Sequence, residues 1–406
     1  GKNTTIIKLE HNGYNLGIDN SKIKKIELIK KYEPTKYKEK KIIFDKNLPT
    51  VSVLSIGGTI SSKVDYRTGG VFADYTAKDF VNMMPELKNI ANINAKKVMT
   101  LMSEDMIPDD WTKIASHIEK EIKKGVDGIV ITQGTDTLHF TAHALSFMIN
   151  CNIPIVITGS QRSIDRGSSD AFMNLLCSVK AAAHFNGSGI MTCLHGSSND
   201  DYCLLIRGTK VRKMDTSRRD AFRPINDIPL AKVYPNEKIN DFEILNKRYD
   251  LADRNNKKEI ILNNNFEENT ALLYVYPGFN PKVLEFYLKQ NIKGLVIGAT
   301  ALGHVNICTD KSLMPLLKKY YQKKIPVIIS SQTLYGSTNS FVYSNLRKLS
   351  IEANAIYVND MHPEVTYIKL GWVLSQTNNY DKVKEMMLTN YKYEFSEKLT
   401  SDMFLY

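Results

Sequence analysis

Apolar residues fall along the chain in short runs separated by amphipathic stretches, a pattern that predicts alternating strands and helices. The first predicted strand, Val51 to Ile56, ends at two glycines. Further strands are expected at 128–132, 154–159 and 190–194, with helices at 138–148 and 170–183 and a short helix opened by Thr76. A helix after Asp109 carries its apolar residues on one stripe: Trp111, Ile114, Ala115, Ile118 and Ile122. Repeated strand and helix units predict a parallel sheet with helices on both faces.

A second unit of the same kind follows a break in the pattern. Residues 236–269 contain nine asparagines and read as a connection between domains. Apolar strands then return at 271–276, 294–297 and 326–330, with helical stretches between them. We therefore predict one α/β domain over 47–235 and a smaller one over 270–406, each doubly wound around a parallel sheet.

The N-terminal 46 residues form a small basic module of their own. They hold 12 lysines against 6 acidic residues, a net charge of +6. Two strands around the turn Asn12-Gly13 predict a hairpin, and a third strand is expected at 24–29. So few residues need more strands, or a neighbour to dock on, to form a stable sheet.

Composition places the 406-residue chain among globular proteins, with 43% apolar and 24% charged residues. The net charge of +11 suits a polyanionic partner or serves solubility alone. Five cysteines without a C-x-x-C pair indicate neither a disulfide framework nor a zinc site, so reduced thiols and a cytoplasmic location are expected. No apolar run is long enough for a membrane span. The chain begins at Gly1 and not at methionine, which leaves an upstream start open.

Two predicted strand ends carry candidate chemistry. Gly58 and Thr59 follow the first strand, and Gly134, Thr135 and Asp136 follow the strand at 128–132. Each motif alone is also typical of a turn or a helix N-cap. Together they bring two hydroxyls and a carboxylate to one edge of a parallel sheet, where α/β proteins place their sites. A weak nucleophile needs a base and an orienting group nearby, and this edge supplies such groups.

The expected base is a lysine that can give up its proton. Lys213 is the candidate, within the segment RGTKVRKM after the strand at 190–194. Composition does not choose between Lys213, Lys210 and Arg212, and a solvated basic loop is the alternative reading.

The motifs resemble those of the type I/II L-asparaginase superfamily, in GGTI at 57–60 and GTDT at 134–137. The resemblance runs from Val51 to the C-terminus. Within that superfamily the chain is most similar to the family of D-type subunits of archaeal glutamyl-tRNA(Gln) amidotransferase. The similar segments are SKVDYRTG at 62–69, SEDM at 103–106, DDYCLL at 200–205 and VRKMDTSRRDAF at 211–222. The N-terminal hairpin resembles the small β-barrel that precedes the catalytic domains in that family.

The resemblance implies a role for each matching residue. Thr59 is implied as the acylated nucleophile, Thr135, Asp136 and Lys213 as a proton relay, and Tyr66 as a mobile residue that closes over the substrate. Ser103 and Glu104 are implied to hold the substrate's α-amino and α-carboxyl groups, and Asp136 also binds the α-amino group. Glycine N–H groups beside Thr59, with Gly58 and Gly134 in the binding site, supply oxyanion stabilisation. Gln133 stands where the family commonly has histidine, and the N-terminal module is shorter than the family's prefix.

The implied fold is two asparaginase-type α/β domains with a small N-terminal β-barrel-like module. The implied function is the glutaminase subunit of a tRNA-dependent amidotransferase, without a metal or cofactor in this chain. ATP and Mg²⁺ are expected in a kinase and transamidase partner, the E-type subunit of the same complex. A homodimer of this chain within a heterotetramer, engaging Glu-tRNA(Gln) mainly through the partner, is also implied.

Two alternative functions remain open. The first is a free-standing L-asparaginase, although such an enzyme needs neither the N-terminal module nor the 200–222 segment. The second is a nucleotide-binding module, which is disfavoured because neither glycine-rich phosphate-binding motif is complete after the first strand.

Overall fold

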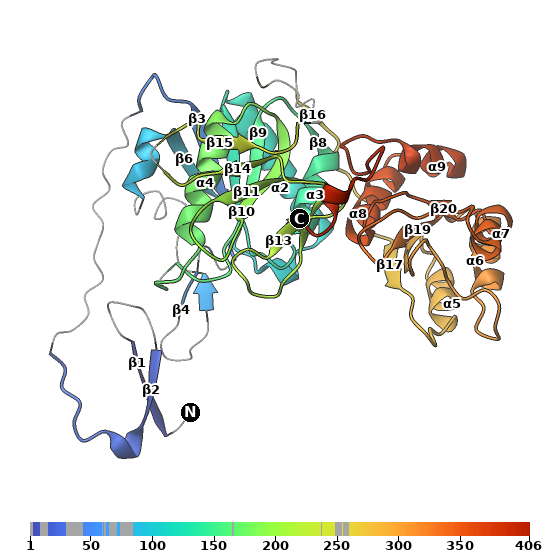
Figure 1. The fold of residues 1–406 in the computed structure, drawn as a ribbon, viewed down its shortest axis with the longest axis horizontal. Helices are drawn as coiled ribbons and strands as arrows, with labels where there is room; N and C mark the ends of the chain where they lie inside the picture. The colour runs from blue at the N-terminus through green and yellow to red at the C-terminus, as the bar shows by residue number, and fades with distance from the viewer. Residues whose placement is uncertain are drawn as a thin grey trace.

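The structure is a computed structural model that describes residues 3–8, 15–29, 44–58, 60, 62–64, 71–73, 84–164, 166–236, 238–247, 254 and 260–406. Thr59, Tyr66, the turn at Asn12-Gly13 and the helix predicted after Thr76 lie outside these ranges. The described residues form two α/β units, one central and one at the C-terminal end in Figure 1, and a small N-terminal hairpin.

The first unit is built on an eight-stranded mixed sheet. In spatial order its strands are β15 (Phe242–Ile244), β14 (Ala231–Val233), β11 (Cys203–Arg207), β10 (Gly189–His195), β9 (Pro154–Thr158), β7 (Gly128–Thr132), β3 (Thr50–Ser55) and β6 (Asn92–Lys97). The strands from β10 to β6 are parallel, as predicted, and the strands from β11 to β15 are antiparallel. The antiparallel part begins because only residues 196–202 connect β10 to β11, too few for a parallel crossover.

Both faces of this sheet are covered, because side chains along each strand alternate between them. Leu54 and Ile131 point into a core with α2 (Pro108–Lys123) and α3 (Leu138–Met148). Val53 and Val130 point into the opposite core, where α4 (Ala171–His184) packs. Of the predicted stripe on α2, Trp111, Ile114, Ala115 and Ile118 are buried, and Ile122 is half-buried against the same core.

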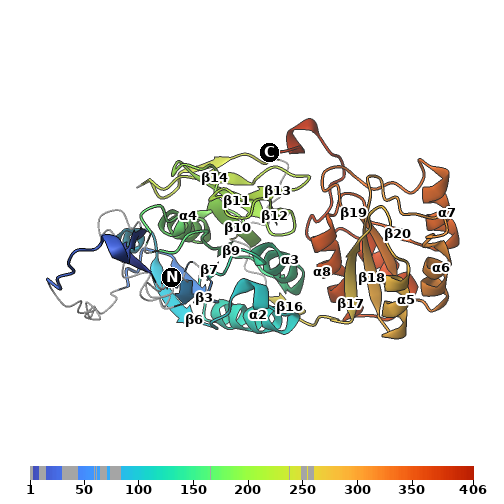
Figure 2. The same ribbon diagram turned by 90° about the horizontal axis from the view of Figure 1, so that it is seen from below.

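The second unit is a four-stranded parallel sheet in the order β17 (Thr270–Tyr274), β18 (Gly294–Ala299), β19 (Val327–Ser331) and β20 (Ile356–Tyr357). Its helices are α5 (Lys282–Lys289), α6 (Met314–Gln322), α7 (Ser344–Glu352), α8 (Pro363–Leu374) and α9 (Tyr380–Leu388). Figure 2 shows α8 between this sheet and α3 of the first unit. One apolar core runs across this junction, since Leu145 and Phe147 of α3 share it with Val365 and Ile368 of α8.

Four small pairings complete the described strands. They are β1 (Thr4–Lys8) with β2 (Asn15–Asp19), β4 (Ser62–Val64) with β5 (Val71–Ala73), β8 (Ile149–Asn150) with β16 (Ile261–Leu262), and β12 (Val211–Lys213) with β13 (Phe222–Pro224). The 3₁₀ turns are η1 (Asn20–Lys22), η3 (Pro85–Asn89), η4 (Ser103–Asp105) and η5 (Ser401–Met403). The boundaries predicted for the domains stay predictions, and β15 and β16 lie within the predicted connection.

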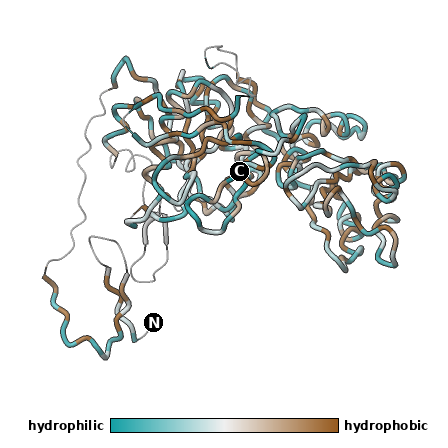
Figure 3. The backbone as a smooth tube through the Cα atoms, viewed as in Figure 1, coloured by the Kyte–Doolittle hydropathy of each residue, from teal (hydrophilic) through white to brown (hydrophobic). Residues whose placement is uncertain are grey.

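The strand predicted at 24–29 is wrong. Residues 23–29 have no regular secondary structure, and the side chains of Ile26, Leu28 and Ile29 are exposed. An apolar run forms a strand only when another strand pairs with it, and no described residue pairs with this one. Residues 23–29 belong to neither of the two larger sheets, and Figure 3 shows hydrophobic stretches in the N-terminal part of the tube, away from the main body. Among the described residues, no helix has the length and apolar character needed to span a membrane.

Candidate active site

The carboxyl ends of β3 and β7 touch through glycine backbone. Gly57 and Gly58 have φ angles of +119° and +79°, in the region that favours glycine. A Cβ on Gly58 would lie 2.1 Å from the backbone nitrogen of Gly134, and one on Gly134 would lie 2.8 Å from Ser103 Oγ. Only glycine therefore allows the two strand ends and the turn at Ser103 to meet.

A lysine joins the polar residues at the end of β7. Lys213 Nζ donates hydrogen bonds to Thr135 Oγ1 at 2.9 Å and to Asp136 Oδ1 at 2.7 Å. The hydroxyl of Thr135 is buried, the side chain of Lys213 is 10% exposed, and that of Asp136 is 63% exposed. The three predicted relay residues thus form one cluster that opens to solvent on the Asp136 side.

The fold explains why Lys213, and not its cationic neighbours, reaches this cluster. Lys210 is buried and pairs with Asp360 at 2.7 Å. Arg212 turns the other way along β12 and pairs with Glu364 of α8. Lys213, at the end of β12, remains to contact Thr135 and Asp136.

The predicted substrate-binding turn lies against the same cluster. Ser103 is buried on η4, where its Oγ accepts a hydrogen bond from the Asp136 N–H at 3.2 Å and its carbonyl accepts one from Thr137 Oγ1 at 2.6 Å. Glu104, the next residue, is exposed. The turn therefore offers a hydroxyl beside the carboxylate of Asp136 and a free carboxylate at the surface.

Glu364 of the second unit holds the strand that carries Lys213. Its Oε1 accepts hydrogen bonds from Arg212 Nε and Nη2 at 3.0 and 2.8 Å, and from the Tyr274 hydroxyl at 3.2 Å. Its Oε2 contacts His362 Nδ1 at 2.9 Å. Burial alone would raise the pKa of Glu364, but His362 and Arg212 hold this pKa well below its usual value. The carboxylate is therefore charged near neutral pH.

Sequence reasoning missed a group of buried histidines next to the site. His139 and His143 of α3 stack edge to face at 5.8 Å, and His143 lies 5.0 Å from the ring of His362. Burial lowers the pKa of His139 to about 3 and that of His143 well below its ordinary value. These two rings are therefore neutral at pH 7. The sequence places His139 two positions after Thr137, so its closeness to the GTDT motif could have singled it out.

The described part of this site holds neither a set of metal ligands nor a cysteine pair. Within the described ranges, no group of three or more His, Cys, Asp or Glu side chains is arranged to hold a metal ion. The five cysteines are free thiols, three of them buried: Cys177, Cys193 and Cys203. The chemistry of the described site rests on hydroxyl, ammonium, carboxylate and backbone groups.

Comparison with protein families matches both α/β units. Residues 50–245 match the family described as asparaginase, N-terminal, and residues 269–387 match the glutaminase/asparaginase C-terminal domain. Among curated relatives, the D-type subunit of the glutamyl-tRNA(Gln) amidotransferase of Methanosphaera stadtmanae is 45% identical over 407 residues, covering 100% of this chain and 90% of that protein. The protein of the same name from Pyrococcus abyssi is 43% identical over 405 residues, covering 99% of this chain and 90% of that protein.

Solved structures give a more distant likeness. The thermostable L-asparaginase from Thermococcus kodakarensis has a TM-score of 0.74 and 28% identity, covering 86% of this chain and 100% of its own. L-asparaginase I from Vibrio cholerae has a TM-score of 0.73 and 26% identity, covering 86% of this chain and 99% of its own.

Proposed function

The chain belongs to the family of D-type subunits of glutamyl-tRNA(Gln) amidotransferase, and from this membership and the site geometry we propose the reaction that it performs. It is the glutaminase subunit of a tRNA-dependent amidotransferase. It hydrolyses the side-chain amide of glutamine and supplies ammonia for the conversion of Glu-tRNA(Gln) to Gln-tRNA(Gln) on a partner subunit. The observation that carries the proposal is the bridge from Lys213 to Thr135 and Asp136 beside the Gly58–Gly134 contact.

In the proposed mechanism Thr59 is the nucleophile. Its oxygen attacks the amide carbon, the C–N bond breaks, ammonia leaves and an acyl-threonine forms. Water then attacks the acyl carbon and releases glutamate. The proton removed from each attacking oxygen passes toward Thr135 and Lys213. The first returns to the leaving nitrogen to give ammonia, and the second returns to the Thr59 oxygen when glutamate leaves. The contact between Lys213 and Thr135 supports this relay.

The remaining groups bind and orient glutamine. Asp136 and Glu104 each offer an exposed carboxylate that suits the α-amino group, and the Ser103 hydroxyl suits the α-carboxylate. The N–H groups of the glycine turn stabilise the oxyanion of each tetrahedral intermediate. Tyr66 closes over the bound substrate, and loop closure of this kind commonly completes an active site.

A free-standing L-asparaginase is the alternative function, since the compared solved structures carry that name. Identity favours the amidotransferase component, because the named relatives are 43% and 45% identical over the whole chain and the asparaginases 28% and 26%. The alternative predicts full activity without a partner.

The partner and its chemistry belong to the same proposal. The E-type kinase and transamidase component of the complex binds ATP and Mg²⁺, while this chain needs no cofactor of its own. Two copies of this chain form a homodimer within a heterotetramer in the cytoplasm. Glu-tRNA(Gln) contacts mainly the partner.

The proposal is tested by measuring ammonia release from glutamine by the chain alone, with the partner subunit, and with the partner and Glu-tRNA(Gln). A chain that feeds another active site wastes glutamine unless the two sites are coupled. Such coupling is on the order of 1–3 kcal/mol, or about 5- to 150-fold in rate. We expect weak hydrolysis by the chain alone and a rise of this size in the full mixture. Equal rates in all three mixtures would contradict the proposal and favour the asparaginase alternative.

A further inference from the structure

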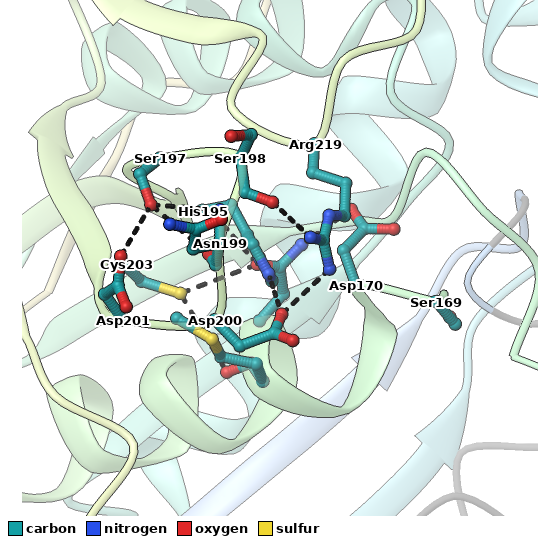
Figure 4. A network of polar contacts seen from close by, with 12 residues as sticks. Ser169, Asp170, His195, Ser197, Ser198, Asn199, Asp200, Asp201, Cys203 and Arg219 are labelled. Carbon is teal, nitrogen blue, oxygen red and sulfur yellow. Dashed lines mark hydrogen bonds and ion pairs between the residues drawn. The ribbon is translucent and has the colours of Figure 1, made fainter. Parts of the chain in front are cut away.

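A buried histidine joins α4 to the loop that connects β10 and β11 (Figure 4). His195 is the last residue of β10, and its side chain is fully buried. Its Nδ1 lies 2.6 Å from Asn174 Oδ1 of α4, and its Nε2 lies 2.9 Å from Asp200 Oδ1 of the connecting loop. Each ring nitrogen therefore faces an oxygen atom, and the hydrogen-bonding roles of these two oxygens decide the charge of the ring.

Hydrogen bonds fix the orientation of the Asn174 amide. Asn174 Nδ2 lies 2.9 Å from the Gly159 carbonyl, which only accepts, and Oδ1 lies 3.0 Å from the backbone nitrogen of His195, which only donates. A flipped amide would place two acceptors together at Gly159 and two donors together at His195. The atom beside His195 Nδ1 is therefore an acceptor oxygen, and this ring nitrogen carries a proton.

The second ring nitrogen of His195 also faces an acceptor. Asp200 Oδ1 pairs with Arg219 Nη1 at 2.9 Å, and a carboxylate in such a pair has no proton to donate. A neutral ring protonated on Nδ1 would set the lone pair of Nε2 against the lone pairs of Asp200. An imidazolium donates at both nitrogens, so the geometry requires the charged form of His195.

The charged and titratable groups around the ring suit an imidazolium. Asp200 and Arg219 pair with each other next to it. Burial raises the pKa of Asp170, which lies before α4, and a positive charge on His195 acts in the opposite direction. Burial also raises the pKa of Cys203, the residue opposite His195 on β11, well above its ordinary value, so this thiol adds no charge. Two carboxylates and two cations therefore offset one another in this network.

Asp200 in turn holds the loop that follows Lys213. Lys213 and Phe222 are paired residues where β12 ends and β13 begins, and Arg219 lies in the loop between them. Arg219 donates hydrogen bonds to Asp200 Oδ1 and to the Ser198 carbonyl. The loop that begins after Lys213 is thus fixed to the loop that begins after His195.

We propose that His195 is a positioning residue for glutamine hydrolysis: as an imidazolium it holds Asp200, which with Arg219 holds the loop after Lys213. Loss of the ring proton sets lone pairs against each other and releases Asp200 toward water, since 67% of its side chain is already exposed. The tether through Arg219 then weakens, and Lys213 loses its fixed place beside Thr135. The inference rests on the function proposed above, in which Lys213 belongs to the relay.

The charge of His195 is tested by NMR on the full chain labelled with ¹⁵N-histidine. Nitrogen chemical shifts distinguish protonated from unprotonated ring nitrogens, and His195→Gln identifies the signals of this ring. We expect both nitrogens to be protonated at pH 7. In Asp200→Asn the amide offers an N–H to Nε2 and an oxygen to Arg219, so the ring should be neutral there. A neutral ring in the wild type, or an unchanged imidazolium in Asp200→Asn, would overturn the inference.

The positioning role is tested by glutamine hydrolysis with the partner subunit. Asp200→Ala removes the acceptor shared by His195 and Arg219, and we expect kcat to fall roughly tenfold with KM near the wild-type value, because a displaced catalytic group slows the reaction. Asp200→Asn pairs with a neutral ring, so its kcat relative to wild type should rise as the pH increases from about 6 to about 9. A purely structural role would give a ratio independent of pH, and that result would overturn the proposal.

Asp201→Ala is the matched control. Asp201 is the next residue of the same loop and is exposed, and among the described residues it accepts a hydrogen bond from Ser197 Oγ at 3.2 Å. This variant should keep the wild-type kcat and the imidazolium signals. A kcat loss equal to that of Asp200→Ala would contradict a specific role for Asp200.

Two further outcomes are separable. If Asp200→Ala does not fold, Asp200→Asn still decides through the NMR signals and the pH dependence of its kcat. A wild-type chain that releases no ammonia from glutamine with its partner would contradict the proposed function. A neutral His195 in an active chain would contradict this inference alone.

Discussion

Removing the charge of Glu364 should damage both stability and catalysis, because this carboxylate holds Arg212 next to Lys213. The Glu364 side chain is 6% exposed and that of Arg212 is 26% exposed. In Glu364→Gln, both hydrogen bonds from the guanidinium face a neutral amide, and a half-buried cation loses its counter-charge. Breaking a buried ion pair from one side costs about 3–5 kcal/mol, and the partial exposure of Arg212 places the expected loss at the lower end, about 3 kcal/mol.

The catalytic part of this prediction follows from the place of Arg212 in β12. A released guanidinium allows the strand to shift, and a misplaced Lys213 lowers kcat without weakening substrate binding in proportion. We expect a kcat loss on the order of tenfold, since small displacements of catalytic groups have large effects on rate. The assay is glutamine hydrolysis at saturating substrate, run beside urea unfolding.

Glu394→Gln is the control for this prediction. Glu394 pairs with Lys369 at 2.5 Å, and both side chains are fully buried. This substitution should destabilise the second unit at least as much as Glu364→Gln does, yet leave kcat at the wild-type value in folded protein. Equal effects of the two substitutions on kcat would refute the reasoning that Glu364 positions Lys213.

Three further predictions concern single side chains. Lys213→Arg should be nearly as inactive as Lys213→Met in glutamine hydrolysis, because arginine keeps the charge but does not release its proton, and an active arginine variant would show that charge alone matters. Burial raises the pKa of Glu121, but hydrogen bonds from Lys124, Lys96 and the Ser52 hydroxyl outweigh it and lower this pKa from 4.5 to about 2. Ionised Glu121 therefore contributes about 3 kcal/mol to the free energy of unfolding above pH 4.5, and this contribution is lost as the pH falls toward 2. In urea unfolding, Glu121→Gln should be less stable than wild type at pH 7, and the difference should be much smaller at pH 2. Because burial lowers the pKa of His139 to about 3, the unfolded chain binds a proton there below pH 6.5 that the folded chain does not. Between pH 6.5 and 3, the free energy of unfolding of His139→Leu should therefore fall less steeply with pH than that of wild type, by up to about 1.4 kcal/mol per pH unit. The same pH dependence in both proteins would contradict this prediction.

Local pattern predicted the strand ends that build the site. The runs at 51–56 and 128–132 match β3 and β7 to within one residue, and the helix at 138–148 matches α3. The glycines after both strands marked the place where their ends touch, because glycine is needed wherever backbones approach this closely. Strand ends and close backbone contacts at glycine depend on residues that are neighbours in the sequence, so the sequence alone could predict them.

Residues far away in the chain decide which of the three cations contacts Thr135 and Asp136. Lys210, Arg212 and Lys213 share one basic segment, and composition did not separate them. In the structure, Asp360 pairs with Lys210 and Glu364 pairs with Arg212, and both acids lie about 150 residues further along the chain.

The roles of Thr59 and Tyr66 stay predictions from the family resemblance. Both residues lie outside the part of the chain that the structure describes. Gly58, whose backbone meets that of Gly134, directly precedes Thr59 in the sequence.

The most direct test of the account is glutamine hydrolysis by Thr59→Ala, measured with the partner subunit beside a Thr333→Ala control from an exposed turn of the second unit. Removing a nucleophile that acts together with a relay should lower kcat by several orders of magnitude while circular dichroism stays unchanged. The control should keep wild-type activity. A Thr59→Ala chain that folds normally and retains even about a tenth of wild-type kcat would contradict the acyl-threonine mechanism, since loss of a catalytic unit's nucleophile leaves far less than that.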